Sequence, residues 1–263
     1  EKIIARWSDE PAIFAWDIRN EPQVWWYSRA GMRRRAKHHK HHGDWRKRMR
    51  EYLAPRVGLW REHARRTLGI DVGEELPPAE TDGQDRRVYR EYIRFAEGLA
   101  EHWLATQCKT IRSAGAKQLI TVGLIQWSVP VHLPHWNAYS CFNPRRVAPH
   151  VDYMSVHFYP MLRDPAAGLE AEIDLQRAYL ETVARGARAP DKPLVIEEFG
   201  WKGGKKVPAD DRAFPEEHQT LWCELLMEVT GRVASGWLNW GYADADSCLL
   251  YTSPSPRDLS TSR

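Results

Sequence analysis

The sequence predicts an α/β fold built on a parallel sheet that is covered on both faces. Short apolar runs alternate with longer amphipathic segments, and the runs show no alternation of polar and apolar residues. Strands of that kind are buried on both faces, as in parallel sheets with crossover helices. The apolar fraction of 43% supports a sizeable core within 263 residues. An α/β barrel and an open doubly wound sheet both fit this pattern.

The first predicted elements are a helix end, a buried strand and a long helix. Residues 1–7 are typical of a helix end, and residues 11–18 form a short apolar run that follows the turn signal of residues 9–11. From Arg87 to Ser113, apolar side chains recur at three- and four-residue steps, which predicts the strongest helix. Asp85 is expected to cap this helix and Gly115 to end it.

The second half of the chain repeats the rhythm of strand and helix. Apolar runs predict buried strands at 118–123, 151–160, 193–201 and 234–242. Helices are expected over about 167–185 and from Pro215 to Gly231, because proline suits a first helical turn and glycine a helix end. No glycine-rich phosphate loop opens any of these helices, so the sequence predicts no nucleotide cofactor.

Residues 23–86 form a long polar insertion with a very basic stretch, RRRAKHHKHH, at 33–42. This stretch is open to two functional interpretations, which are binding of phosphate or an acidic polymer and metal binding by its four histidines, His38, His39, His41 and His42. No cysteine or carboxylate pairs with these histidines at a recognised spacing, so a solvated, partly helical loop without a metal is the favoured interpretation. The net charge of only +3 and the lack of a recognition motif argue against nucleic acid as a partner.

The chain ends have their own compositions. Residues 247–263 lack periodicity and are rich in Ser, Pro and Arg, which predicts a disordered tail that also resembles translated sequencing-adapter read-through. The chain begins with Glu, so a leader is expected to be missing, and the preferred location of the intact parent is secreted or periplasmic. No apolar run approaches the ~18 residues of a membrane span.

Polar side chains stand at the C-terminal tips of the predicted strands. Glu21 follows the first strand, His157 and Tyr159 end the third, and Glu197 and Glu198 end the fourth. Because parallel strands end on one face of the fold, these groups are expected to meet there. Two carboxylates in different environments suit cleavage of a glycosidic bond, in which one donates a proton and the other attacks or activates water. Capping by Glu21, a salt-bridged strand end and a satisfied core histidine are the structural alternatives.

Four motifs carry a resemblance to a known group of enzymes. WDIRNEP and VIEEFGW resemble the two catalytic strand motifs of clan A glycoside hydrolases, nearest to the family 5 cellulases and mannanases. SVHFYP is similar to the strand between them, and GWLNWGY to the strand that closes the barrel. The resemblance implies a (β/α)8 TIM barrel over 1–246, incomplete because the acid/base strand comes first. Only strands four to eight are expected, and this chain is expected to be poorly stable and weakly active.

The resemblance also implies roles for particular residues. Glu21 would be the general acid/base and Glu198 the nucleophile of a retaining mechanism on a β-linked glucan, mannan or related glycan. Strand alternation favours Glu198 over Glu197, because Glu198 is then expected to share a face with Leu194 and Ile196. The substrate-binding residues that we expect are Asn20 at the sugar 2-hydroxyl, Tyr159 and His157 near the nucleophile, Trp240 as the floor of the sugar subsite, and Trp127 as a further platform.

Thirteen tryptophans are compatible with either core anchors or sugar platforms. Trp237 is expected in the core, whereas Trp25 and Trp26 are equally compatible with loop packing and sugar stacking. Three other functions remain open from the sequence: a β-galactosidase-like exo-glycosidase, a non-catalytic glycan-binding barrel, and a nucleic-acid-binding protein based on the basic insertion. The Glu21/Glu198 pair favours catalysis.

Overall fold

The structure is a computed structural model, which describes residues 2–24, 45–73, 76–77, 86–130, 139–160, 169–200 and 219–240. Within 45–53, the side chains of 45–50, 52 and 53 lie outside the description. The chain divides into two compact units. The first contains residues 1–22, 104–131 and 143–263, and the second contains 23–103 and 132–142.

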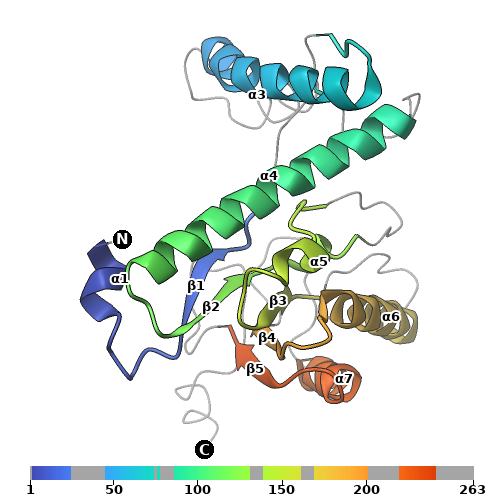
Figure 1. Cartoon of the computed structure of the whole chain (residues 1–263). Helices are drawn as coiled ribbons and strands as arrows, with labels where there is room; N and C mark the ends of the chain where they lie inside the picture. The colour runs from blue at the N-terminus through green and yellow to red at the C-terminus, as the bar shows by residue number, and fades with distance from the viewer. Residues whose placement is uncertain are drawn as a thin grey trace, which may run out of the picture. The chain divides into compact units, whose positions relative to one another are not determined.

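The first unit alternates strands with helices (Figure 1). It begins with α1 (Lys2–Trp7) and β1 (Ala15–Asn20), and continues through the C-terminal part of α4 (Arg86–Ser113) into β2 (Leu119–Gly123). The 3₁₀ turn η1 (Gln126–Ser128) and the short α5 (Pro144–Val147) precede β3 (Met154–Phe158). The unit continues with α6 (Leu169–Ala187), β4 (Leu194–Phe199), α7 (Gln219–Thr230) and β5 (Gly236–Asn239).

All strand pairings between these elements are parallel. β1 pairs with β2, and β3, β4 and β5 pair in that order. A parallel bridge between Leu124 and Val156 links β2 to β3, with the His157 amide donating to the Leu124 carbonyl at 2.7 Å. The strands therefore follow one another in space in the order in which they occur in the chain. An open doubly wound sheet reverses that order at a switch point, so the described strands favour the barrel arrangement, and the predicted α/β fold class is confirmed.

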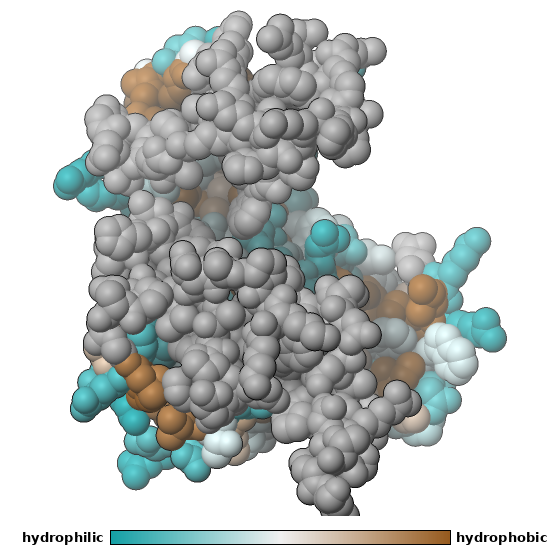
Figure 2. Space-filling model, turned by 180° about the vertical axis from the view of Figure 1, so that it is seen from behind, coloured by the Kyte–Doolittle hydropathy of each residue, from teal (hydrophilic) through white to brown (hydrophobic). Residues whose placement is uncertain are grey.

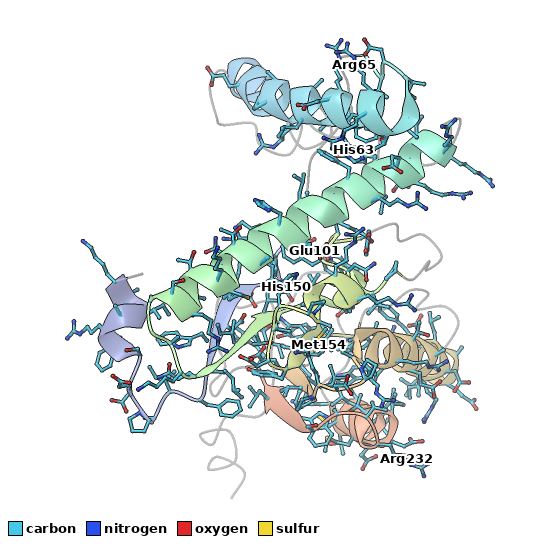
Figure 3. The ribbon with its side chains drawn as sticks, viewed as in Figure 1. His63, Arg65, Glu101, His150, Met154 and Arg232 are labelled. Carbon is cyan, nitrogen blue, oxygen red and sulfur yellow. The ribbon has the colours of Figure 1, made fainter. Side chains whose placement is uncertain are left out.

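The core of this unit lies between the strands and their helices. Phe158 is fully buried, and its ring lies 5.2 Å from that of Tyr179 on α6 and 5.6 Å from that of Trp222 on α7. Figure 1 shows α6 and α7 side by side next to this part of the sheet. Met154, labelled in Figure 3, begins β3 and is fully buried. Phe158 and Met154 thus point to the helix side, which leaves the alternate residues of β3 for the opposite face.

The outer strands of the described sheet are less covered than the inner ones. β3 is buried throughout, whereas Asn20 at the end of β1 and Leu238 on β5 are exposed. Phe14 beside β1 is 71% exposed. On the face seen in Figure 2, hydrophobic surface adjoins hydrophilic surface. Among the described strands, β1 and β5 each pair with a single neighbour and are the outer strands.

The second unit has a separate aromatic core between α3 (Trp45–Leu68) and the N-terminal part of α4. The Trp60 side chain is completely buried, and its ring centroid lies 5.1 Å from that of Tyr92 and 5.6 Å from that of Phe95. His63 reaches from α3 to α4, where its Nε2 lies 2.9 Å from Glu91 Oε1 (Figure 3). Composition marks 23–86 only as a polar insertion, with no helix predicted around Trp60, whereas α3 is a helix in which Val57, Trp60 and Ala64 are buried.

The predicted elements occur with small changes in their limits. Gly115 ends α4 with a φ of +95°, a left-handed conformation that glycine adopts without strain. The histidine-rich stretch 33–42, Trp25, Trp26, Asp85, Pro215 and the tail 247–263 lie outside the described residues. The limits of the predicted catalytic domain, 1–246, stay a prediction. Among the helices in the described ranges, none combines the length and apolar character that a membrane crossing requires.

Candidate active site

Three polar side chains meet at the C-terminal ends of β1, β3 and β4. His157 Nδ1 lies 3.2 Å from Glu21 Oε1 and 3.3 Å from Glu198 Oε2. The His157 side chain is 1% exposed, that of Glu198 is 13% exposed and that of Glu21 27%. The parallel sheet explains this meeting, because strands that run in one direction end on one face. The structure thus brings together two carboxylates that are 177 positions apart in sequence, around one buried imidazole.

Glu21 has an unusual backbone conformation. Its φ is +44°, in the left-handed region that residues other than glycine rarely adopt. Its amide donates to the Gly123 carbonyl at 2.9 Å, so the neighbouring strand holds this conformation in place. Strained residues of this kind cost about 1–3 kcal/mol and cluster at functional sites. The strand tip therefore keeps Glu21 in a strained backbone conformation, which a simple capping role does not explain.

Glu198 lies in a largely buried environment with two partners that favour its ionised form. The Tyr159 hydroxyl donates to Glu198 Oε2 at 2.9 Å, which is the contact that the resemblance implies. Burial raises the pKa of Glu198 and the charges of Glu21 and Asp17 add to this, whereas His157 and the Tyr159 hydrogen bond lower that pKa. Tyr159 and His157 thus favour the ionised carboxylate, which a nucleophile requires.

The strand-alternation argument that favours Glu198 over Glu197 is wrong. Ser155 pairs with Val195 and Val156 with Ile196, but His157 pairs with Glu198 because the register shifts by one residue. Ile196 therefore shares the helix side with Val156, whereas Glu198 lies on the face of His157. This β-bulge brings two consecutive glutamates to one face. The distinction between them rests on contacts: Glu198 meets His157 and Tyr159, and Glu197 meets Ser155 and Tyr153.

Gly123 and Gln126 shape the site without being chemically reactive. A Cβ on Gly123 would lie 2.5 Å from His157 Nε2 and 3.1 Å from Asp17 Oδ2, so only glycine leaves room for both. Gln126, which is 2% exposed, accepts from the Tyr159 amide at 2.7 Å and donates to the Tyr159 carbonyl at 3.0 Å. Sequence reasoning missed both residues. Their only signal is their position, since Gly123 ends the predicted strand at 118–123 and Gln126 follows it three residues later.

The expected sugar-contacting residues occupy the same end of the sheet with different exposures. Asn20 ends β1 beside Glu21 and is exposed. Trp240 directly follows β5, is 45% exposed, and its amide donates to the Phe199 carbonyl at 2.8 Å. Trp127 lies in the 3₁₀ turn after β2 and is partly buried. Trp237, which is expected in the core, is partly buried and donates its indole N–H to Thr230 on α7 at 2.8 Å.

The Glu21, His157 and Glu198 side chains also satisfy the spacing of a metal site. Their facing ligand atoms all lie within 4.8 Å of one another. Imidazole and carboxylate are ligands that Zn²⁺ accepts. The same short spacing suits proton transfer and nucleophilic attack on a single bond, for which no metal is needed. We therefore treat the three as a carboxylate pair bridged by histidine.

Comparisons with known proteins were made against solved structures, curated proteins and family models. Among solved structures, the chain is similar to β-glucuronidase from Ruminococcus gnavus in complex with D-glucuronic acid, with a TM-score of 0.36 and 16% identity over 54% of this chain and 23% of that one. A β-glucuronidase from Bacteroides uniformis gives a TM-score of 0.38 and 15% identity over 63% of this chain and 18% of that one. The chain therefore spans less than a quarter of the length of these two proteins.

No curated protein shows significant similarity to the chain. A family model does match, and its description is Cellulase (glycosyl hydrolase family 5). The match covers residues 97–245, which is more than half of the chain and includes His157, Tyr159, Glu198 and Trp240. The chain belongs to glycosyl hydrolase family 5, the cellulase family.

Proposed function

We propose that the protein is a retaining β-glycosidase that cleaves O-glycosidic bonds by double displacement, with Glu21 as acid/base and Glu198 as nucleophile. The observation that carries the proposal is the short separation of the two carboxylates, whose facing oxygens lie within 4.8 Å of each other. Retaining enzymes place these groups about 5–5.5 Å apart, whereas inverting enzymes need about 6.5–9.5 Å to admit a water. The spacing supports direct attack by one carboxylate.

In the first step, ionised Glu198 attacks the anomeric carbon and a carbon–oxygen bond to the enzyme forms. The bond to the leaving oxygen breaks, and protonated Glu21 gives that oxygen its proton. In the second step, ionised Glu21 takes a proton from water, whose oxygen attacks the same carbon and releases Glu198. Tyr159 and His157 support the ionised state of Glu198 between these steps, since each lowers its pKa.

The proposed substrate is a β-linked glucan, mannan or related glycan. Asn20 lies next to Glu21 at the tip of β1 and would bond the sugar 2-hydroxyl. The exposed Trp240 would form the floor of the subsite, and Trp127 a further platform, because the apolar face of an indole suits the CH face of a sugar ring. The family description supports a carbohydrate substrate.

Glutamine substitutions test the two roles. On aryl β-glycosides, Glu21→Gln and Glu198→Gln should each abolish most turnover, and positioned acid–base groups alone contribute about 10²–10⁴-fold. Glu228→Gln on α7 is the matched control, because its carboxylate binds Arg177 on the surface. Turnover near wild type in either active-site variant would show that the assignment of roles is wrong.

A further inference from the structure

Glu197 and Glu198 lie on the same face of β4, although successive residues in a regular strand point to opposite faces. The register explains how this happens. Val195 and Ile196 pair with consecutive residues of β3, and the next pairing skips Glu197 and joins Glu198 to His157. Glu197 is therefore the extra residue of the bulge. The proposed mechanism uses Glu198 alone, so the neighbouring carboxylate needs its own explanation.

The carboxylate of Glu197 accepts hydrogen bonds from two hydroxyl groups, one at Tyr153 just before β3 and one at Ser155 on β3. The Ser155 hydroxyl donates to Glu197 Oε2, and the Tyr153 phenol donates to Oε1 at 3.3 Å. Both donors are well buried, Ser155 at 1% and Tyr153 at 5% exposure. They lie two and four residues before His157, so alternation places all three on one face. We call the set of Glu197, Ser155 and Tyr153 the clamp.

The clamp occupies a costly environment for a carboxylate. Burial raises the pKa of Glu197 and the charge of Asp17 raises it further, while the bond from Ser155 is the largest opposing influence. Burying a charged group is worthwhile for stability only when its partners compensate, and an apolar side chain of similar size often serves stability equally well. Stability alone is therefore a poor reason for a glutamate at this position. A role as acceptor for the two hydroxyl groups accounts for both of its carboxylate oxygens.

We propose that Glu197 is a positioning residue, and that the clamp holds the bulge of β4 and thereby keeps Glu198 on the face of His157 and Tyr159. This inference rests on the proposed function, because Glu197 acts through Glu198. Without the clamp, β4 can return to regular alternation, and a shift of one residue moves a side chain to the opposite face. Glu198 would then leave its hydrogen bond to Tyr159. In this role Glu197 transfers no proton and forms no covalent bond.

Four variants separate the parts of the clamp. Glu197→Ala removes both acceptor oxygens, Glu197→Gln keeps one, and Ser155→Ala and Tyr153→Phe each remove one donor. With aryl β-glycosides, Glu197→Ala should lower kcat by about 100-fold, the loss that a misplacement of about 1 Å can cause, and leave KM near wild type. Glu197→Gln should restore part of the turnover. Adding Ser155→Ala to Glu197→Ala should cause little further loss, because both changes remove the same contact.

A control distinguishes positioning from a general loss of stability. Thr230→Val removes another buried hydroxyl, which donates to Leu226 and accepts from Trp237, and should lower the melting temperature without lowering kcat. Crystal structures give a readout that needs no activity. The Glu197→Ala structure, or that of Ser155→Ala if the first variant does not fold, should show Glu198 displaced from Tyr159.

Two results would overturn the proposal. The first is wild-type kcat in Glu197→Ala, or a loss confined to KM. The second is a crystal structure of that variant with the bulge and the 2.9 Å contact between Tyr159 and Glu198 unchanged. If the wild-type protein turns over no glycoside, the proposed function fails, and the crystal structures still decide whether the clamp holds the bulge.

Discussion

Replacing Gly123 with alanine tests the position of His157 by adding a single methyl group. The new Cβ would lie 2.5 Å from His157 Nε2 and 2.9 Å from its Cε1, whereas ordinary van der Waals contacts begin near 3.4 Å. The imidazole would have to move by about 1 Å. Because His157 Nδ1 is 3.2–3.3 Å from Glu21 and Glu198, a displacement of that size breaks at least one of these contacts.

The expected magnitudes follow from this displacement. Overpacking of a buried site costs about 1–3 kcal/mol in the free energy of unfolding. A misplacement of about 1 Å near reacting groups lowers turnover by up to about 10²-fold. The backbone of Gly123 is not in the left-handed region, so steric contact is the source of both effects. Gly123→Ala should therefore lose both stability and kcat.

The assay combines urea denaturation with kcat on an aryl β-glycoside. Gly98→Ala is the matched control, because Gly98 lies within α4 and a Cβ there would meet nothing within 4 Å. In that control the free energy of unfolding should rise by about 0.5–1 kcal/mol, because alanine is favoured over glycine inside a helix, and turnover should stay unchanged. Wild-type stability together with wild-type kcat in Gly123→Ala would show that His157 does not lie over Gly123 as the structure places it.

Three further predictions concern pH, metal ions and the core. Burial places the pKa of Glu198 above its ordinary value of 4.5, so the acid limb of kcat/KM should lie above pH 4.5. Tyr159→Phe should move this limb to higher pH, because it removes a hydrogen bond that lowers the pKa of Glu198 in the wild type. The folded protein holds such protons more tightly than the unfolded chain, so the free energy of unfolding should fall as pH rises through this range, as urea titrations would show. Zn²⁺ should inhibit competitively through Glu21, His157 and Glu198, and EDTA should reverse it. Phe158→Ala should cost about 3–5 kcal/mol in urea denaturation, because Phe158 is fully buried.

Much of the first unit could be predicted because its strands are uniformly apolar and its helices are periodic. The predicted strand at 151–160 contains β3, and the predicted helix at 167–185 overlaps most of α6. The strand predicted at 11–18 ends too early, since β1 runs to Asn20, which pairs with Gly123. Backbone pairing continues through the polar residues at the end of β1, and hydropathy alone does not reveal this extension.

The candidate site was predictable at its charged residues but not in its detailed geometry. Glu21, His157, Tyr159 and Glu198 stand at strand tips, which the topology of a parallel sheet brings together. The bulge at Glu197 could not be predicted, because alternation is a property of regular strands and a single extra residue reverses it. The order of contacts around His157 likewise depends on three-dimensional packing.

The second unit shows where composition misleads. By its composition 23–86 is a polar insertion, with no helix predicted around Trp60, yet α3 packs a fully buried Trp60 against Tyr92. Val57, Trp60 and Ala64 recur at three- and four-residue steps along α3, and all three are buried. That spacing is a helical signal. The many arginines around it conceal the signal when the segment is judged by its composition alone.

If Glu198 attacks the sugar, it forms a covalent glycosyl–enzyme intermediate, and trapping that intermediate identifies the nucleophile. A 2-deoxy-2-fluoro β-glycoside with a good leaving group slows breakdown of the glycosyl–enzyme intermediate, and peptide mass spectrometry then locates the label. The structure predicts a single label on Glu198, at the carboxylate that Tyr159 and His157 contact. A label on Glu197, or steady turnover of the parent glycoside with no covalent adduct, would contradict the account.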